Sequence, residues 1–349
     1  MTHFCTLFDS NYLTRGLALY HSLESQCEAF HLYVVAFNQH CYDYLANAKL
    51  PFLTPIRLQD FEDEKLLGIK SSRSVAEYCW TCTASVILYS IEKFDLPCCT
   101  YVDADMIFYS DPEILFRELN GKSVAITEHN YTHDYDQSEK SGRYCVQFMY
   151  FRNNQDGLTA LRWWRERCIE WCYARVEDGK FGDQKYLDDW LTRFKGVHVI
   201  QHAGAGIAPW NVQKFDIRIG KDNDLEVRKK GTDQWAPLVF YHFHGVKFYT
   251  DSMVSCCGPV YEINEKVKDA LYKPYFRNLL QLEEQLKTEG VDYNTNGARS
   301  TSPTPASVRI QFLKDRFALL KAGNIGLGGL HFFSFAAKHD HFQKTNELV

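Results

Sequence analysis

Short apolar runs alternate with helical patterns through the first 130 residues, and this alternation constrains the fold more than any other feature of the chain. Strands are expected at 3–8, 30–37, 54–58, 98–102 and 124–127, with helices between them at 13–25, 41–48 and 75–92. Strands that are separated by helices are joined by right-handed crossovers, which make the strands parallel. The pattern predicts an α/β protein with a mostly parallel, Rossmann-like sheet flanked by helices.

The second half of the chain mixes strands and helices and then changes composition. Strands are expected at 144–151, 197–201 and 238–243, and helices at 157–175, 183–194 and 263–289, the last broken near Pro274. Residues 291–306 are rich in Asn, Gly, Ser, Thr and Pro, which is typical of a linker or flexible loop. A helix over 307–322 and an apolar tail are expected after it.

Composition and charge exclude several classes of protein. Of 349 residues, 45% are apolar and 24% are charged, an ordinary globular mixture that excludes a disordered chain. Lys and Arg number 39 against 44 Asp and Glu, a net charge of −5. A surface devoted to nucleic acid is usually basic, so no nucleic-acid partner is expected. No stretch of 18 apolar residues exists that could span a membrane.

Twelve cysteines and the N-terminus bear on the cellular compartment. The sequence starts directly with a strand-like run, without a charged and apolar leader, so we expect a cytoplasmic protein. Most cysteines lie inside apolar runs and are expected to be reduced core residues. Cys79 and Cys82 have the spacing of a metal knuckle, but no second pair follows at the distance that a zinc site needs.

Two carboxylates follow directly on an apolar strand at Asp103 and Asp105. At this spacing both side chains can face one side of an extended chain. Hard oxygen ligands at the carboxyl end of a strand suit a divalent cation that carries a diphosphate. A solvated acidic loop is the simpler explanation of an isolated Asp-x-Asp, but the apolar residues on both sides make solvent exposure less favoured here.

A second group of polar residues follows the run that begins at Phe240. His242 and His244 share one face of the expected strand, Gly245 allows a close approach of the backbone, and Lys247 follows. Imidazole binds cations such as Mn²⁺, and an ammonium group suits a phosphate. Two histidines with ordinary hydrogen-bond partners on an edge strand are the alternative.

Three further segments carry polar or aromatic side chains. The turn from Phe8 to Tyr12 ends the first strand, where a parallel sheet commonly binds a nucleotide, although an N-cap explains it as well. Asp183 opens a helix that it could simply cap. The loop 208–211, with Trp210, could line a pocket or form a plain turn. The polar and aromatic segment 128–136 could form a lid or an acceptor wall, or a solvated loop.

Taken in order, these segments resemble glycosyltransferase family 8 of the GT-A fold, the family of glycogenin and of bacterial lipooligosaccharide galactosyltransferases. The resemblance covers roughly residues 3 to 250 and consists of ordered motifs. The family's uridine-binding Asp-x-Asn-Tyr-like turn is matched by Asp9, Asn11 and Tyr12. Its metal motif falls on Asp103 and Asp105.

The resemblance also implies the remaining site residues. The family's Asp-Gln pair beside the anomeric carbon is matched by Asp183 and Gln184. Its third metal ligand is matched by His242, with His244 as a rival ligand. Gly245 fits the same His-x-x-Gly-x-x-Lys segment, in which Lys247 comes one residue early. The implied donor-binding residues are Phe8, Asp9, Asn11, Tyr12, Ala104, Gly245 and Lys247, the metal ligands Asp103, Asp105 and His242, and the catalytic residues Asp183 and Gln184.

The chain departs from the family pattern at two places. The family's Asn-Ala-Gly or Asn-Ser-Gly turn is replaced by the run 144–147, and the basic residue before the metal motif has no counterpart, with Lys70 and Arg73 as the nearest substitutes. These departures predict a divergent bacterial branch. The resulting domain prediction is a GT-A catalytic domain over 1–255, a helical extension over 256–290, a linker or flexible loop over 291–306 and a C-terminal helical and apolar tail over 307–349.

The resemblance predicts a Mn²⁺- or Mg²⁺-dependent enzyme that moves a sugar from a UDP-sugar to a carbohydrate or lipid-linked glycan with retention of configuration. The resemblance also implies a role in the synthesis of surface polysaccharides. Peripheral contact with the inner face of a membrane is one role for the apolar tail, and packing on the catalytic domain is the other.

Two other functions are compatible with the sequence. One is a sugar-phosphate nucleotidyltransferase, although the Gly-rich basic loop that such enzymes use is absent after Phe8 and only Arg15 and Gly16 lie nearby. The other is a non-catalytic nucleotide-sugar-binding protein.

Overall fold

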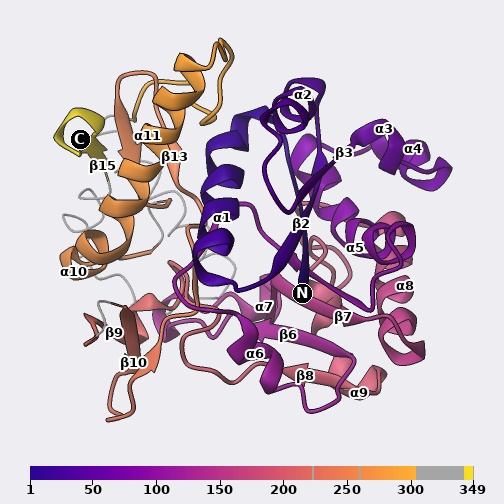
Figure 1. The fold of residues 1–349 in the computed structure, drawn as a ribbon. Coiled ribbons are helices and arrows are strands. Elements are labelled where there is room, and N and C mark those ends of the chain that lie inside the picture. The colour runs from indigo at the N-terminus through magenta and orange to yellow at the C-terminus, as the bar shows by residue number, and fades with distance from the viewer. Residues whose placement is uncertain (222–223, 259–260, 304–341, 349) are drawn as a thin grey trace.

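A seven-stranded sheet forms the centre of the molecule (Figure 1). The computed structural model describes residues 1–221, 224–258, 261–303 and 342–348. The strand order is β3-β2-β1-β4-β7-β6-β8, and β7 alone runs antiparallel to its neighbours. The predicted α/β fold with a mostly parallel sheet is confirmed. The strands of this sheet are β1 (Thr2–Phe8), β2 (Phe30–Ala36), β3 (Leu53–Arg57), β4 (Cys98–Val102), β6 (Val124–Glu128), β7 (Tyr144–Arg152) and β8 (Val197–Val199).

Helices cover both faces of this sheet, and alternate side chains of each strand pack under them. In β1, Phe4 and Phe8 belong to the core beneath α1, whereas Cys5 and Leu7 belong to the core beneath α5 and α8. Figure 1 shows α1 on one side of β2 and the pair α5 and α8 on the other. The flanking helices are α1 (Leu13–Gln26), α2 (Gln39–Ala48), α5 (Val75–Lys93) and α8 (Gln155–Glu170).

Local sequence signals start these helices where the pattern places them. Ser74 caps α5 and forms a reciprocal capping box with Glu77, while Asn38 caps α2 and Asn154 caps α8. Each side-chain oxygen accepts a hydrogen bond from a backbone N–H that has no partner inside the helix. Helix starts are therefore encoded locally.

Short elements connect and extend this core. The short helices are α3 (Leu58–Phe61), α4 (Glu64–Lys70), α6 (Glu113–Arg117), α7 (Ser138–Ser141), α9 (Trp190–Arg193) and α10 (Glu265–Val267), with 3₁₀ turns at Ser10–Tyr12, His133–Tyr135, Lys185–Leu187, Val212–Lys214 and Thr345–Glu347. The small sheets contain β5 (Met106–Phe108) with β12 (Phe240–His242), then β9 (Phe215–Ile219), β10 (Leu225–Lys229) and β11 (Ala236–Pro237), then β13 (Lys247–Phe248), β14 (Met253–Ser255) and β15 (Phe342–Lys344).

Two predicted helices take a different form. The expected helix over 183–194 is a 3₁₀ turn followed by α9. The Trp164 indole N–H donates to the Asp183 carbonyl oxygen at 2.9 Å, so that carbonyl does not begin an α-helix. The expected break near Pro274 is a π-helical turn over Lys268–Tyr272, which leads directly into α11 (Lys273–Thr288). Pro274 sits in the first turn of α11, where its missing N–H costs no hydrogen bond.

The C-terminal part of the described chain returns to the first helix. Leu279 and Leu286 of α11 belong to the same hydrophobic core as Leu17 and Leu19 of α1, and Figure 1 shows the two helices beside each other. Residues 291–303, which the composition favours as a linker, contact the start of α1. The predicted helix over 307–322 and most of the apolar tail lie outside the described residues.

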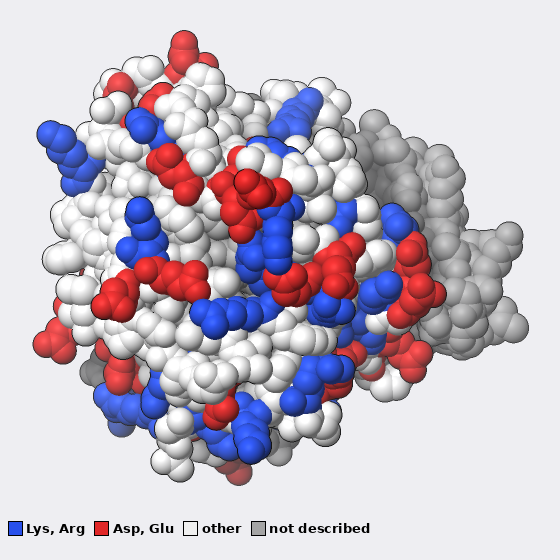
Figure 2. All heavy atoms as spheres, turned by 90° about the vertical axis from the view of Figure 1, so that its right-hand side faces the viewer, with Lys and Arg blue, Asp and Glu red and all other residues white. Residues whose placement is uncertain are grey.

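The length and apolarity of the helices and the surface charge bear on what surrounds the protein. Within the described ranges, no helix combines the length and apolarity that a bilayer crossing requires. On the face in Figure 2, acidic and basic side chains are interspersed. Ion pairs such as Lys65 with Glu166 and Arg162 with Glu92 link α4, α5 and α8 in the same part of the fold. Exposed pairs of this kind contribute at most about 1 kcal/mol each.

Candidate active site

The carboxyl ends of β1 and β4 meet at the point where the strand order reverses. These strands are parallel neighbours, with Cys5 opposite Tyr101, while β1 leads onward to β2 on its other side. Ligands of open α/β sheets bind in the crevice at such a switch point. The turn that begins at Asp9 and the turn that begins at Asp103 both lie at this edge, because each directly follows its strand.

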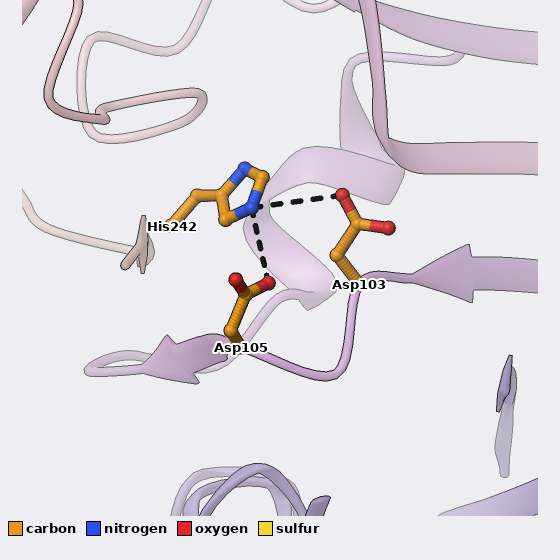
Figure 3. Close-up of side chains that lie close together, drawn as sticks. All are labelled: Asp103, Asp105 and His242. Atoms are coloured by element: carbon orange, nitrogen blue, oxygen red, sulfur yellow. Dashed lines mark ion pairs between the residues drawn. The ribbon is translucent and has the colours of Figure 1, made fainter. Parts of the chain in front are cut away.

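Three side chains that the sequence singled out come together beside this edge (Figure 3). The Nε2 atom of His242 lies 3.1 Å from Asp105 Oδ1 and 3.7 Å from Asp103 Oδ2. The pairing of β12 with β5 places His242 opposite Met106, and thus beside Asp105. Of the two histidines on this strand, His242 joins the carboxylates, whereas His244 is exposed and is not part of the group.

Gln147 fixes the orientation of the His242 ring. His242 Nδ1 lies 2.9 Å from Gln147 Oε1, and Gln147 Nε2 donates to Thr127 Oγ1 at 3.3 Å. Because the amide N–H is used by Thr127, the amide oxygen faces His242 and accepts its Nδ1 proton, which leaves Nε2 for the carboxylates. This role of Gln147 was not predicted from the sequence. A polar residue inside the apolar run of β7 was the available signal.

Burial and charge oppose each other within the group. Burial acts to raise the pKa of Asp105, but the His242 imidazolium outweighs it and holds that pKa at about 2. Burial raises the pKa of Asp103, against the pull of His242. Burial also acts to lower the pKa of His242, but the neighbouring carboxylates raise it well above its usual value. The two carboxylates thus favour a proton on His242, and a metal ion bound by this nitrogen would compete with that proton.

The donor atoms fit a divalent cation. One ligand atom from each of the three residues lies within 4.8 Å of the other two. Ligands bound at about 2.1 Å around one ion lie about 3 to 4 Å apart, so a small adjustment would close the site. Two carboxylates and an imidazole suit Mn²⁺ and are compatible with Mg²⁺. Gln147 supplies the hydrogen bond that orients a histidine ligand.

The turn after β1 is already held by its own side chains. Asp9 accepts hydrogen bonds from the backbone and the side-chain amide of Asn11, at 2.9 and 2.8 Å. Tyr12 is 40% exposed at the end of the turn, where its ring could meet a ligand. Phe8 and Ala104 are buried and act here as packing residues, so a ligand could reach them only through their backbone. The turn thus fits both the N-cap interpretation and a ligand site.

The remaining predicted residues lie around the same edge. Gly245 has a φ of +83°, which favours glycine, in the loop that follows His242, and the exposed Lys247 begins β13. Asp183 is 6% exposed, and its pKa rises to about 7 because of burial and then the charge of Asp103. Gln184 follows it in a half-buried position. These positions are compatible with their predicted roles and do not test them.

Aromatic and polar side chains extend from the metal group toward β6. The buried Trp210 contacts the rings of His242 and His129, and His129 stacks on Tyr131. Beyond them lies a polar cleft of about 700 Å³. Its lining is Glu128, Asn130, Tyr131, Asp136, Ser138, Glu139, Arg143, Gly179, Lys185 and Asp188. The segment predicted as an acceptor wall or loop thus lines one side of this cleft.

Lys70 and Arg73, the two substitutes for the missing basic residue, contact described residues outside the metal group. Lys70 pairs with Glu62 at 2.6 Å, and Arg73 stacks on Tyr173 and donates to a carbonyl oxygen of α8. Both side chains therefore have partners in the helical layer.

Comparison with known proteins yields two relatives. YfnD, an uncharacterized protein of Bacillus subtilis strain 168, is 30% identical over 295 residues, which cover 83% of this chain and 93% of YfnD. YfnF of the same strain is 27% identical over 300 residues, which cover 83% of this chain and 96% of YfnF. No family model matches the sequence.

Solved structures with some likeness carry glycosyltransferase names. A galactosyltransferase LgtC complex with donor and acceptor sugar analogues has 14% identity and a TM-score of 0.48, over 82% of this chain and all of LgtC. Mouse xyloside xylosyltransferase 1 has 12% identity and a TM-score of 0.43, over 69% of this chain and 97% of that protein. GlyE of Streptococcus pneumoniae TIGR4 has 11% identity and a TM-score of 0.46, over 84% of this chain and 65% of GlyE. Likeness at this level does not assign a function.

Proposed function

The chain belongs to the same family as YfnD of Bacillus subtilis, and from its site we propose that it is a metal-dependent glycosyltransferase that uses a nucleotide-diphosphate sugar. The group of Asp103, Asp105 and His242 at the switch point of the sheet carries this proposal. It combines three side chains that could hold a cation with the sheet edge at which α/β proteins bind nucleotides. The bound cation would supply Lewis-acid stabilisation of the departing nucleoside diphosphate.

The protein's own residues take defined parts in this proposal. The turn from Asp9 to Tyr12 binds the nucleoside, with the exposed Tyr12 ring available to stack on a base. Lys247 adds positive charge near the phosphates, and Gly245 lets the backbone approach them. Asp183 and Gln184 lie beneath the sugar and stabilise or orient it as the anomeric carbon gains positive charge. This arrangement corresponds to retention of configuration.

The resemblance to glycosyltransferase family 8 supports a more specific proposal for the donor, the ion and the acceptor. We propose a UDP-sugar as donor, Mn²⁺ as the preferred ion and a carbohydrate or lipid-linked glycan of surface polysaccharide synthesis as acceptor. The cleft beyond Glu128 is of a size that small ligands occupy. The cytoplasmic location, the membrane contact and the division into domains stay predictions.

The test is turnover by the purified protein with Mn²⁺ and a panel of UDP-sugars. Asp103→Ala and Asp105→Ala should each lose at least about 100-fold in turnover while keeping the circular-dichroism spectrum of the wild type. Asp156→Ala, an exposed carboxylate on α8, is the matched control and should keep full activity.

Three outcomes of this experiment separate the alternatives. Full activity in either metal-site variant would overturn the proposal. Consumption of a nucleoside triphosphate with a sugar phosphate, and not of nucleotide sugars, would identify a nucleotidyltransferase. Binding of a nucleotide sugar without transfer or hydrolysis would identify a binding protein.

A further inference from the structure

Arg15, near the start of α1, is a buried charge without a carboxylate beside it. The residue is 2% exposed. Within the part of the chain that the structure describes, no Asp or Glu oxygen lies within 4.0 Å of its guanidinium. The charge of Arg15 acts on Asp105 from farther away and is one of the causes that lower the pKa of that carboxyl. Burial of a charge that has no direct ion pair is costly, so a chain that keeps one commonly gains something else from it.

Backbone carbonyls from separate segments accept the hydrogen bonds of the guanidinium. Arg15 Nη1 donates to the Asn296 carbonyl oxygen at 2.9 Å, and Nη2 donates to the Val246 carbonyl oxygen at 3.1 Å. A longer contact of 3.5 Å joins Nη1 to the Asn11 carbonyl oxygen. One side chain thus joins the turn after β1, the loop after His242 and the segment that follows α11.

The last of these segments forms a tight turn over 294–298. The Thr295 carbonyl oxygen accepts from the backbone N–H of Thr14 at 3.2 Å and from its hydroxyl at 3.1 Å, so it caps the start of α1. Gly297 has a φ of +79°, and a Cβ atom there would lie 3.3 Å from the Asn11 carbonyl oxygen. The turn over 294–298 therefore packs directly on the turn proposed to bind the nucleoside.

The guanidinium also supports an aromatic ring of the site. Its carbon lies 4.5 Å from the centre of the Tyr12 ring and 5.7 Å from that of Phe248. The Nε atom of Arg15 is buried and makes no hydrogen bond with any residue that the structure describes. The guanidinium of Arg15 therefore packs over the Tyr12 ring, and its Nε–H has no acceptor among the described residues.

We propose that Arg15 is a positioning residue of the donor site: it holds Tyr12, the loop after His242 and the turn over 294–298 together, and its charge favours an anionic nucleoside diphosphate. This inference rests on the proposed function. It also makes the segment that follows α11 a structural part of the donor site. The sign of the charge separates this role from a merely structural one, because a lost cation weakens anion binding and not the binding of a second cation.

The test compares Arg15→Met with Arg15→Lys. Calorimetry measures the binding of Mn²⁺ alone and then of UDP or GDP, whichever the wild type binds, in the presence of Mn²⁺. Arg15→Met should weaken nucleoside diphosphate binding at least about tenfold while leaving Mn²⁺ binding at least as tight as in the wild type, because the positive charge near Asp105 is lost. Arg15→Lys keeps the charge but loses the planar fork, so its nucleotide affinity should lie between the two.

A matched control and a second readout keep the outcomes distinct. Arg165→Met removes another largely buried arginine, which donates to Ser85 on the far helical layer, and should not change nucleotide binding. The backbone amides of residues 294–298 should exchange their hydrogens faster in Arg15→Met than in the wild type, and Arg165→Met should show no such change. Nucleotide binding within twofold of the wild type, or equal losses for Mn²⁺ and nucleotide, would overturn the positioning role.

Failure of the proposed function would look different. In that case the wild type would bind neither UDP nor GDP with Mn²⁺ present. The exchange measurement would then decide alone whether Arg15 fastens the turn over 294–298, and unchanged exchange in Arg15→Met would overturn that part as well.

Discussion

Gln147 controls the geometry of the proposed metal site without being one of its ligands. It touches no cation, yet its side-chain oxygen selects the His242 nitrogen that faces Asp103 and Asp105, and its backbone oxygen accepts from the Asp103 N–H at 3.1 Å. Both a ligand ring and a ligand backbone are thus fixed from one position on β7. Partners of this kind commonly change metal affinity 10- to 100-fold when lost.

Replacement of Gln147 by Met should therefore weaken Mn²⁺ binding by about 10- to 100-fold, because the His242 ring would lose its orienting acceptor. Calorimetry with MnCl₂ measures the change. Gln147→Glu keeps an acceptor for His242 Nδ1 and should stay closer to the wild type. Equal affinities in Gln147→Met and the wild type would show that packing alone orients the ring.

At the residue scale, the sequence indicated the metal-site residues but not their geometry. Asp103, Asp105 and His242 were predicted together from a motif and a resemblance, and the structure brings them within reach of one ion. Their assignment as metal ligands stays a prediction. The sequence left open which histidine joins them, because the choice depends on the pairing of β12 with β5, which no local pattern encodes.

At the scale of elements, the pairing of β5 with β12 places His242 beside Asp105. The strand pattern found β12 but not β5, which has only three residues and directly follows the Asp103 turn. Its pairing partner is more than a hundred residues away. The position of β12 is set in turn by Gly204, whose carbonyl oxygen accepts from the backbone N–H of Val239 at 2.9 Å.

Gly204→Ala should displace β12 and with it His242. A Cβ atom at Gly204 would lie 1.9 Å from the Pro237 carbonyl oxygen, a backbone atom that cannot rotate away. We expect a loss of about 2 to 3 kcal/mol in the free energy of unfolding, together with weaker Mn²⁺ binding. Urea unfolding and calorimetry measure the two effects.

Gly68→Ala is the matched control for this prediction. Gly68 lies exposed in α4 with no atom within 4 Å of an added Cβ, so this change should be neutral or stabilise the protein by up to about 1 kcal/mol. If both variants had the same stability, the close approach of Gly204 to Pro237 would not control the position of β12.

At the scale of the whole molecule, the site joins segments from three parts of the chain. The Asp103 turn follows β4, His242 ends β12, and the turn over 294–298 fastens to α1 from beyond α11. A cation bound by residues so far apart in sequence has little affinity for the unfolded chain. Binding should therefore stabilise the folded state as a unit.

Mn²⁺ should accordingly raise the melting temperature of the wild type. At a hundredfold excess over Kd, the expected stabilisation is about 2.7 kcal/mol, which corresponds to a shift of several degrees. Differential scanning calorimetry with and without MnCl₂ measures it. Asp105→Ala should show no shift, and an equal shift in this variant would place the bound ion elsewhere.

Local sequence patterns were enough to predict the α/β class, the mostly parallel sheet, the boundaries of α1, α2 and α5 within two residues, and the residues of the proposed metal site, whereas α8 ends at Glu170 and not at the expected residue 175. The patterns suffice because periodicity, capping residues and short motifs act within a few residues of one another. Three features depend on tertiary contacts: β7 runs antiparallel, Gln147 orients His242, and Arg15 fastens residues 294–298 to the site. Each of these rests on contacts between residues far apart in the chain, and such contacts are set by how the elements pack.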